Sequence, residues 1–292
     1  MELAIVYSPA KQQGFLPLAD FQMLDQLCLH ALQNEVVAWP KPGLVTPVDS
    51  GSHKDMNIGT FLQSIDALKG TFSEMAMAAA LGHGFEAMMA IGRQTEAKML
   101  RATNGINTHR GAIFNLGLLA SAAALRSCNP DLTGLESGKI VSMQWGGKIL
   151  AARPAYTASH GNLVFQRYAK AGARGEAATG FPMVYGYGIP VLRALLQEGY
   201  GHELALIGAL MALIEQVDDS NLLWRGGEEG LAFAKKTAQE FNSNGGVTQS
   251  GWQDKLIRIH RSFMERRLSP GGSADLVAAS WVAYHLDMQG TL

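Results

Sequence analysis

Cysteine, net charge and long apolar runs are all scarce in this sequence, and each scarcity excludes a class of protein. The chain has 292 residues but only 2 cysteines, and Cys28 and Cys128 both lie in apolar stretches that favour small core residues over a disulfide. The formal net charge is −1, so no overall field attracts nucleic acid or an acidic membrane. The most apolar runs, 75–91 and 112–125, are too short or too interrupted by polar residues to span a bilayer.

Several recognisable signals are also missing. No basic segment followed by an apolar stretch opens the chain, which argues against a signal peptide, and with reduced cysteines we expect a cytoplasmic protein. No Cys/His spacing suits zinc, and no Gly-Lys-Ser/Thr follows a glycine-rich turn as a Walker A motif requires. Low-complexity linkers and fixed-period repeats are absent, so residues 1–292 are expected to form a single domain.

Helical periodicity is what the sequence has in abundance. Residues 19–38 place Phe21, Leu24, Cys28 and Leu32 on one stripe, as an amphipathic helix does. Similar patterns cover 57–69, 72–100, 110–127, 137–151, 160–172, 188–198, 202–217, 228–241, 248–267 and 273–288. Only LAIVY at 3–7 resembles a strand, and glycines gather between the helical segments. We therefore predict an all-α fold, a single globular multi-helix domain with long glycine- and proline-rich loops.

The segment NGINTHRGAIFNLGL, residues 104–118, predicts an anion site. Asn107 and Thr108 form a good N-cap pair, and His109, Arg110 and Gly111 open an apolar helix. A helix N-terminus offers unpaired N–H groups and the positive end of its dipole, and an arginine there suggests that a phosphate is held. The alternative is an ordinary capped core helix with a solvated arginine.

A long irregular loop at 39–56, WPKPGLVTPVDSGSHKDM, is a second candidate. Its three prolines prevent a helix, and a structureless loop of this length is usually functional. The polar side chains it offers are Lys41, Asp49, Ser50, His53 and Asp55. Lys41 suits a phosphate, and Asp49 or Asp55 suits Mg²⁺ or the role of a base. A solvated surface loop is the alternative.

Three further clusters carry polar residues. Glu96 lies on the helix that leads into the 104–118 segment, where an ordinary exposed glutamate is the simpler interpretation. Arg174 and Glu176 stand between glycines in 173–182; Arg174 suits phosphate, Glu176 suits a proton or a metal, and a solvated turn is the alternative. The sequence LSPGGSADL at 268–276 offers capping chemistry that also resembles a phosphate cradle.

Two adjacent acids, Asp218 and Asp219, directly follow an apolar helix. They should repel each other and the negative end of the dipole, so Arg225 or a divalent metal is expected to compensate them. Hard oxygen ligands favour Mg²⁺ or Mn²⁺ over zinc. Without a metal, removing both acids should not lower the stability.

Taken together, these segments make the chain similar to the triphosphoribosyl-dephospho-CoA synthase family. The matching segments are EVVAWPKPGLVTPVDSGSHKDM (35–56), TNGINTHRGAIFNLGLL (103–119), ARGEAATGFP (173–182), DDSNLLWRGG (218–227) and LSPGGSADL (268–276). They follow in the same order and span nearly the whole chain. Arg110 in NTHRG resembles the malonate decarboxylase branch, whereas the citrate lyase branch would have lysine. Ser220 replaces an expected threonine and keeps the hydroxyl.

The resemblance implies that ATP and 3′-dephospho-CoA give 2′-(5″-triphosphoribosyl)-3′-dephospho-CoA and adenine. The product is the precursor of the prosthetic group of an acyl-carrier subunit, so ATP, 3′-dephospho-CoA and that carrier pathway are the expected partners, without nucleic acid or membrane. A homodimer is one oligomeric state that the sequence leaves open. The transition state should have oxocarbenium character, by analogy with glycoside cleavage.

The matched segments also imply the site. Lys41, Arg110, Arg174 and Arg225 would neutralise the triphosphate, and Asp218 and Asp219 would hold Mg²⁺. The base would be Asp49, Asp55, Glu96 or Glu176, and His53 or His109 would protonate adenine or hydrogen-bond phosphate. The remaining expected substrate contacts are Ser50, Asn107, Thr108, Asn221, Gly272 and Ser273.

Two rival functions belong to other classes. A helical Mg²⁺-dependent nucleotide or ADP-ribose hydrolase would need similar acids and anion sites, but it would need no acceptor alcohol. A non-catalytic CoA-binding module or scaffold would leave the polar clusters at helix ends unexplained.

Overall fold

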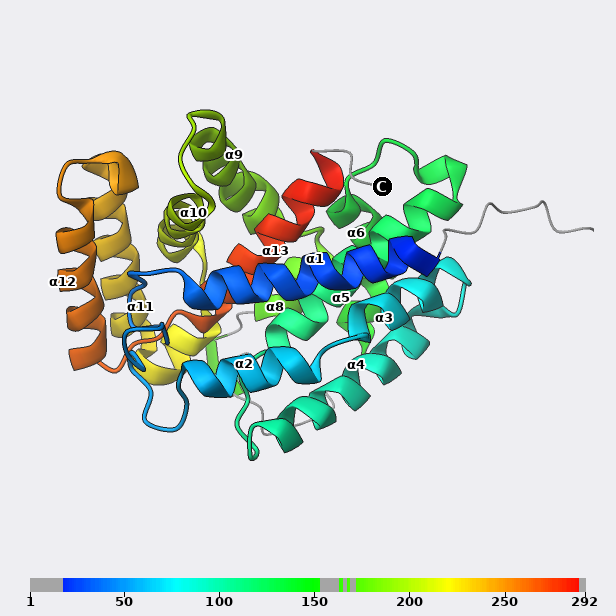
Figure 1. The fold of residues 1–292 in the computed structure, drawn as a ribbon, viewed down its shortest axis with the longest axis horizontal. Coiled ribbons are helices and arrows are strands. Elements are labelled where there is room, and N and C mark those ends of the chain that lie inside the picture. The colour runs from blue at the N-terminus through cyan, green and yellow to red at the C-terminus, as the bar shows by residue number, and fades with distance from the viewer. Residues whose placement is uncertain (1–17, 153–162, 165–166, 169–171, 289–292) are drawn as a thin grey trace, which may run out of the picture.

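The computed structural model describes residues 18–152, 163–164, 167–168 and 172–288, and within them every regular element is a helix (Figure 1). The prediction of an all-α fold is confirmed. The α-helices are α1 (Leu18–Val37), α2 (Ile58–Ala67), α3 (Thr71–Ala80), α4 (Gly84–Ala102), α5 (Arg110–Cys128), α6 (Ser137–Ala151), α8 (Gly172–Ala178), α9 (Ile189–Gln197), α10 (His202–Gln216), α11 (Ser220–Ser243), α12 (Trp252–Glu265) and α13 (Gly271–Asp287). Short helical turns occupy Pro130–Leu132 and Gly246–Thr248, and a π-helical segment occupies Val184–Gly188.

Two helices, α5 and α13, form the centre of the molecule. Both are buried along most of their length, because their sequences are apolar on nearly every side. The α5 helix packs against α3, α13 and α6, and α1 crosses over α13 and α3 (Figure 1). By composition α5 is apolar enough to cross a membrane, yet the fold uses it as a core helix that is 72% buried.

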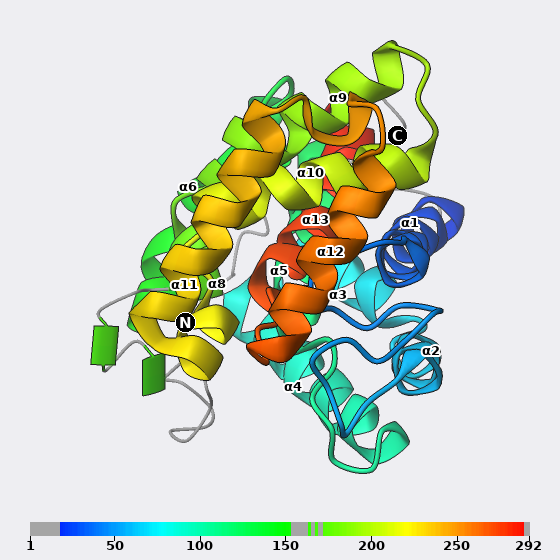
Figure 2. The ribbon, with the colours of Figure 1, turned by 90° about the vertical axis from the view of Figure 1, so that its left-hand side faces the viewer.

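The periphery consists of amphipathic helix pairs. In Figure 2, α11 and α12 run side by side at one end of the molecule. On α12 the buried positions are Leu256, His260 and Phe263, which recur at helical spacing as predicted. The predicted core positions of the cysteines are also confirmed, since Cys28 and Cys128 are both buried and free.

Buried polar groups join the ends of the central helices. The Asp287 carboxylate at the end of α13 accepts from Arg126 Nη1 at 2.7 Å, from Ser137 Oγ at 2.7 Å and from Tyr185 Oη at 2.5 Å. These contacts fasten α13 to the end of α5, the start of α6 and the π-helical segment.

Several predicted boundaries were wrong. The segment 72–100 is two helices, because Gly82 and Gly84 adopt positive φ angles of 75° and 66° and break the helical path. The α11 helix begins at Ser220 and bends at Gly227, earlier than the predicted 228. Residues 173–182 do not form a simple turn, because α8 occupies their first half. The predicted strand at 3–7 and most of the predicted helix at 160–172 lie outside the described residues.

Candidate active site

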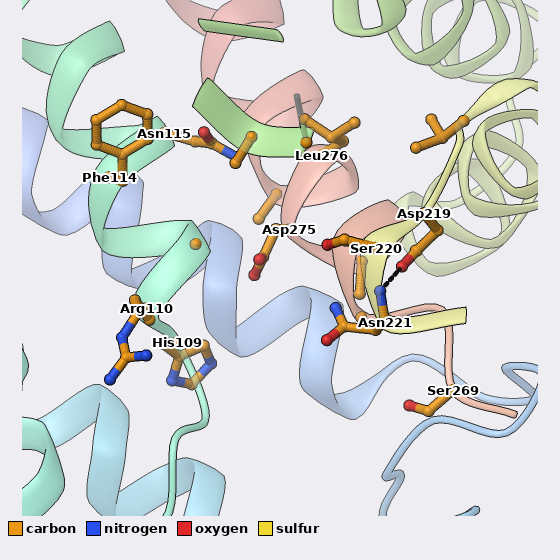
Figure 3. Close-up of a pocket in the computed structure, with 18 of the residues that line it drawn as sticks. His109, Arg110, Phe114, Asn115, Asp219, Ser220, Asn221, Ser269, Asp275 and Leu276 are labelled. Carbon is orange, nitrogen blue, oxygen red and sulfur yellow. Dashed lines mark hydrogen bonds between the residues drawn. The ribbon is translucent and has the colours of Figure 1, made fainter. Parts of the chain in front are cut away.

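A cavity of about 1300 Å³ brings most of the predicted residues together (Figure 3). Its walls come from the end of α1, the loop after it, α2, α8 and the junction of α10 with α11. The first turns of α5, α11 and α13 also lie at the cavity. The predicted site residues that line it are Lys41, His53, Asp55, Asn107, Thr108, His109, Arg110, Arg174, Glu176, Asp218, Asp219, Asn221, Arg225 and Gly272. Segments far apart in the sequence therefore converge on one site.

Four predicted residues do not line the cavity: Asp49, Ser50, Glu96 and Ser273. The Asp49 carboxylate accepts from Gly51 N at 2.9 Å and lies 3.1 Å from His260 Nε2, so it braces the loop against α12. Glu96 is buried and forms an ion pair with the Arg110 guanidinium from outside the cavity. Asp49 and Glu96 are thus placed to organise the site from outside it.

The loop that follows α1 is not a solvated surface loop. Lys41 is 2% exposed, and its Nζ donates to Glu35 Oε1 at 2.7 Å. Burial lowers the pKa of Lys41, whereas the neighbouring Glu35 acts to raise it. A buried, paired ammonium at a cavity wall is available to a phosphate that displaces or shares its carboxylate partner.

His109 points a hydrogen-bond donor into the cavity. Thr108 Oγ1 donates to Ser64 Oγ at 2.7 Å, so the Ser64 hydroxyl proton faces His109 Nδ1, also at 2.7 Å. Nδ1 then accepts, and the proton of the neutral ring lies on Nε2, which has no hydrogen-bond partner. Burial and the nearby Lys41 lower the pKa of His109 to about 3. The ring is therefore neutral near pH 7.

His53 is also held as a neutral ring. Arg225 Nη2 lies 3.1 Å from His53 Nδ1, and His53 Nε2 lies 2.9 Å from Ser269 Oγ. Burial and the positive charge of Arg225 lower the pKa of His53 to about 4. At neutral pH neither histidine carries the second proton of an imidazolium ion, so hydrogen bonding suits both better than acid catalysis.

The two adjacent acids after α10 have different partners. Asp218 Oδ1 accepts from Lys235 Nζ at 2.6 Å, whereas Asp219 is 1% exposed and is the N-cap of α11 (Figure 3). The Asp219 oxygens accept from four donors: Asn221 N at 2.8 Å, Leu222 N at 3.3 Å, Ser273 N at 2.7 Å and Ser273 Oγ at 2.9 Å. The sequence predicted that Arg225 or a metal would compensate the two acids. In the structure the positive charge next to Asp218 is Lys235.

These contacts decide how well the pair suits Mg²⁺. The Asp219 carboxylate has its acceptor positions filled by N–H and O–H donors, so it does not fit a metal ligand. Asp218 lines the cavity with a partly exposed carboxylate, which fits one ligand of an ion carried by a polyphosphate. Within the described part of the chain, no group of three His, Cys, Asp or Glu residues is arranged to hold a metal ion.

Arg174 and Glu176 are ordered by neighbouring helix ends. Arg174 Nη2 donates to Ile149 O at 2.6 Å and to Leu150 O at 3.1 Å, so it caps the last turn of α6. Glu176 Oε1 accepts from Met183 N at 2.6 Å, and burial raises the pKa of Glu176. A carboxyl with a raised pKa inside a cavity is suited to proton transfer.

Two residues that line the cavity, Asp275 and Asn115, were not predicted from the sequence. Asp275, an acid in the first turn of the last helix, accepts from Ala112 N at the start of α5, and burial, Glu35 and Asp219 raise its pKa well above the usual value. A Cβ on Gly111 would lie 2.1 Å from Asp275 Oδ2, so glycine is what permits this approach. Asn115 is the other; its signal was a single carboxamide in an otherwise apolar helix.

Comparison with known proteins shows the family of this chain. The family model described as CitG, ATP:dephospho-CoA triphosphoribosyl transferase, matches residues 21–291. A protein of Vibrio cholerae serotype O1 (strain M66-2) is 34% identical over 91% of this chain and 88% of its own length. One from Pseudomonas fluorescens (strain Pf0-1) is 37% identical over 93% and 94%, and one from Pectobacterium atrosepticum is 36% identical over 90% and 88%.

All three relatives carry the name 2-(5″-triphosphoribosyl)-3′-dephosphocoenzyme-A synthase, qualified as probable for the first two. No solved structure gave a significant match. The family match covers nearly the whole chain, and the relatives share more than a third of their aligned residues with it. The chain is therefore an enzyme that belongs to the ATP:dephospho-CoA triphosphoribosyl transferase family.

Proposed function

We propose that this enzyme transfers the triphosphoribosyl group of ATP to the 2′-hydroxyl of 3′-dephospho-CoA and releases adenine. The observation that carries the proposal is the cavity itself. Its volume of about 1300 Å³ exceeds the roughly 300–1,000 Å³ of a typical single-ligand pocket, as a site for two nucleotides requires. Cationic side chains and carboxyl groups line the same space, which suits a reaction that grips phosphates and moves a proton.

The triphosphate is proposed to lie near Lys41, Arg110 and Arg225. All three line the cavity, and α5, α11 and α13 begin there with the positive ends of their dipoles directed at it. The neutral His109 adds an Nε2–H donor without charge. Arg174 is not assigned to the triphosphate. Its guanidinium already caps α6, so we give it a structural role.

The transfer step joins the acceptor oxygen to the anomeric carbon. The 2′-oxygen attacks C1′ of the ATP ribose, the C1′–N9 bond breaks with its electrons going to adenine, and the hydroxyl proton ends on adenine in the net reaction. We assign the acceptance of the hydroxyl proton to Asp275, which lines the cavity between the first turns of α5 and α11 (Figure 3). Burial, Glu35 and Asp219 raise the pKa of Asp275, so its ionised carboxylate binds a proton more strongly than an ordinary aspartate does.

Mg²⁺ is proposed to enter with the triphosphate rather than to reside in a protein cage. Asp218 would supply the one protein carboxylate, since Asp219 is committed to the caps of α11 and α13. Asp218→Asn should therefore raise the Mg²⁺ concentration needed for half-maximal turnover. An unchanged Mg²⁺ requirement would remove Asp218 from the metal site.

The proposed product supplies the prosthetic group of an acyl-carrier subunit. Arg110 in NTHRG favours the malonate decarboxylase system over citrate lyase, and the reduced cysteines favour the cytoplasm. Restoring an active carrier in a cell that lacks its own synthase, in each of the two systems separately, tests this assignment.

The chemistry is tested by chromatography and mass spectrometry of a mixture of enzyme, ATP, 3′-dephospho-CoA and Mg²⁺. We expect one adenine for each dephospho-CoA consumed, with a product that gains the mass of triphosphoribose. ADP or phosphate as the main product, or adenine released equally fast without dephospho-CoA, would identify a hydrolase instead. Asp275→Asn should lower kcat roughly 10²–10⁴-fold, as loss of a general base does, with little change in KM for ATP.

A further inference from the structure

Asn115 is a buried amide whose polar atoms are unused. It lies on α5, its side chain is 1% exposed, and neither Oδ1 nor Nδ2 has a hydrogen-bond partner. A buried polar group without a partner costs about 1–3 kcal/mol, so native proteins rarely retain one without a reason. Within the described residues, the only other side chains with such orphaned atoms are His109 and Ser121.

The position of Asn115 distinguishes it from Ser121. Asn115 and His109 both line the cavity, whereas Ser121 lies deeper along α5 and away from it. Asn115 is one helical turn beyond Gly111, the residue against which Asp275 packs, and so it lies on the same side of α5 (Figure 3). The orphaned amide therefore sits further into the site than the proposed base.

The surroundings of Asn115 suit a flat apolar ligand. Phe114 and Leu276, labelled with Asn115 in Figure 3, and Met183 also line the cavity and supply apolar surface to it. Of the three cations assigned to the triphosphate, Arg110 opens α5 more than one helical turn before Asn115, and Lys41 and Arg225 come from the loop after α1 and from α11. A nucleotide with its phosphates at the cations and its ribose at Asp275 would direct its base toward this region.

We propose that Asn115 binds the adenine of ATP, the leaving group, through its N6 and N7 edge. An asparagine amide pairs with this edge of adenine in two hydrogen bonds, Oδ1 accepting from the N6 amino group and Nδ2 donating to N7. Guanine presents two acceptors there, O6 and N7, so Oδ1 would face an oxygen. Asn115 thus determines the base specificity of the donor nucleotide; this inference rests on the proposed function.

The same hydrogen bond assists departure of the base. As the C1′–N9 bond breaks, its electron pair enters the purine ring and N7 becomes a stronger acceptor. A donor already aimed at N7 then stabilises the transition state more than the bound substrate. The proton from the acceptor hydroxyl completes neutral adenine, so no additional reagent is needed.

The test combines Asn115→Leu, which keeps the branched shape and the number of side-chain heavy atoms, with 7-deaza-ATP, which lacks the N7 acceptor. The wild-type enzyme should use ATP roughly 10–100-fold better than GTP or 7-deaza-ATP, as a bidentate base contact implies. Asn115→Leu should lose most of its activity with ATP and most of both preferences, while KM for dephospho-CoA stays unchanged. The matched control is Ser121→Ala on the same helix, which should keep both preferences.

Two further measurements keep the inference testable if folding or turnover fails. The Asn115→Leu protein should melt at or above the wild-type temperature, because it loses an unsatisfied amide, and calorimetric titration with adenosine should show weakened binding even without turnover. If the wild-type enzyme showed no transferase activity, adenosine binding that Asn115→Leu still weakens would uphold the adenine contact and refute the proposed reaction. Normal base preference in an active Asn115→Leu enzyme, or a change confined to KM for dephospho-CoA, would overturn the inference.

Discussion

At the scale of single residues, Asp219 shows how one carboxylate can organise a site without touching the reaction. Its two oxygens accept from Asn221 N, Leu222 N, Ser273 N and Ser273 Oγ, which joins the first turn of α11 to the first turn of α13. A Cβ on Gly272 would lie about 3.1 Å from the same carboxyl group, so the close approach depends on glycine. The sequence-based prediction that removing Asp218 and Asp219 should not lower the stability did not anticipate these four donors.

Replacing Asp219 should therefore destabilise the fold. Asp219→Ala removes an N-cap and leaves the buried Ser273 N–H without an acceptor, so we expect a loss of about 2–4 kcal/mol in the free energy of unfolding. The control Asp218→Ala breaks a partly exposed ion pair and should cost about 0–1 kcal/mol. Urea denaturation followed by circular dichroism measures both. Equal losses in the two variants would contradict the capping role.

His109 should make stability depend on pH. Its pKa of about 3 in the folded protein lies below the value of 6.5 for a free side chain. Between the two values the unfolded chain binds a proton that the folded chain does not, so this stability is complete above pH 6.5 and decreases as the pH falls toward 3. The raised pKa values of Glu176, Asp219 and Asp275 act in the opposite direction.

A comparison with His109→Gln isolates the histidine, because all the other titrating groups remain in both proteins. On lowering the pH from about 6.5 to about 4, the wild-type enzyme should lose roughly 3 kcal/mol more than the variant. Urea midpoints at a series of pH values give the difference. Parallel profiles for the two proteins would show that His109 is not held neutral by burial.

At the scale of elements, the contact between α5 and α13 positions the proposed base. The first turns of the two helices meet where Gly111 faces Asp275, and the absence of a side chain at 111 sets their separation. The broad apolar surfaces of the same helices form the core behind this contact. The packing of the core and the geometry of the site are therefore coupled through one glycine.

Gly111→Ala should disturb both stability and activity. The new Cβ would overlap the Asp275 carboxyl, so the helices must separate or the carboxyl must turn away, and overpacking of this kind costs about 1–3 kcal/mol. The matched control is Gly92→Ala in α4, where a Cβ meets nothing within 4 Å and should stabilise the helix by about 0.5–1 kcal/mol. Thermal unfolding and turnover are measured on both variants. An active, stable Gly111→Ala enzyme would separate Asp275 from the chemistry.

At the scale of the whole molecule, the walls of the cavity are formed by many elements and not by one. The loop after α1, the starts of α5, α11 and α13, and α8 all contribute walls, and these segments are spread from residue 32 to residue 278. A ligand in the cavity therefore contacts parts of the chain that separate when the domain unfolds. Binding should stabilise the fold as a unit.

ATP should shift one cooperative unfolding transition. At about one hundred times its dissociation constant it should add about 2.7 kcal/mol to the free energy of unfolding, which raises Tm by on the order of 5 °C in a chain of this size. Arg225→Gln should reduce the shift, whereas Lys236→Gln, on an exposed part of the same helix, should keep it. Scanning calorimetry with and without ATP measures this. An equal shift in Arg225→Gln, or two transitions of which ATP moves one, would contradict it.

The sequence by itself determined the helical class of this protein, the irregular loop after α1 and the segments that meet at the cavity. Apolar periodicity, proline and glycine act over a few residues, so they can be interpreted locally. Only the tertiary structure decided which carboxylates already accept hydrogen bonds from the protein and which buried polar groups have no hydrogen-bond partner. Asp49 contacts His260, 211 residues away, and Asp219 contacts Ser273, 54 residues away. The importance of Asp275 and Asn115 depends on what α5 and α13 place around them. Such partners come from packing between distant helices, which no local pattern encodes.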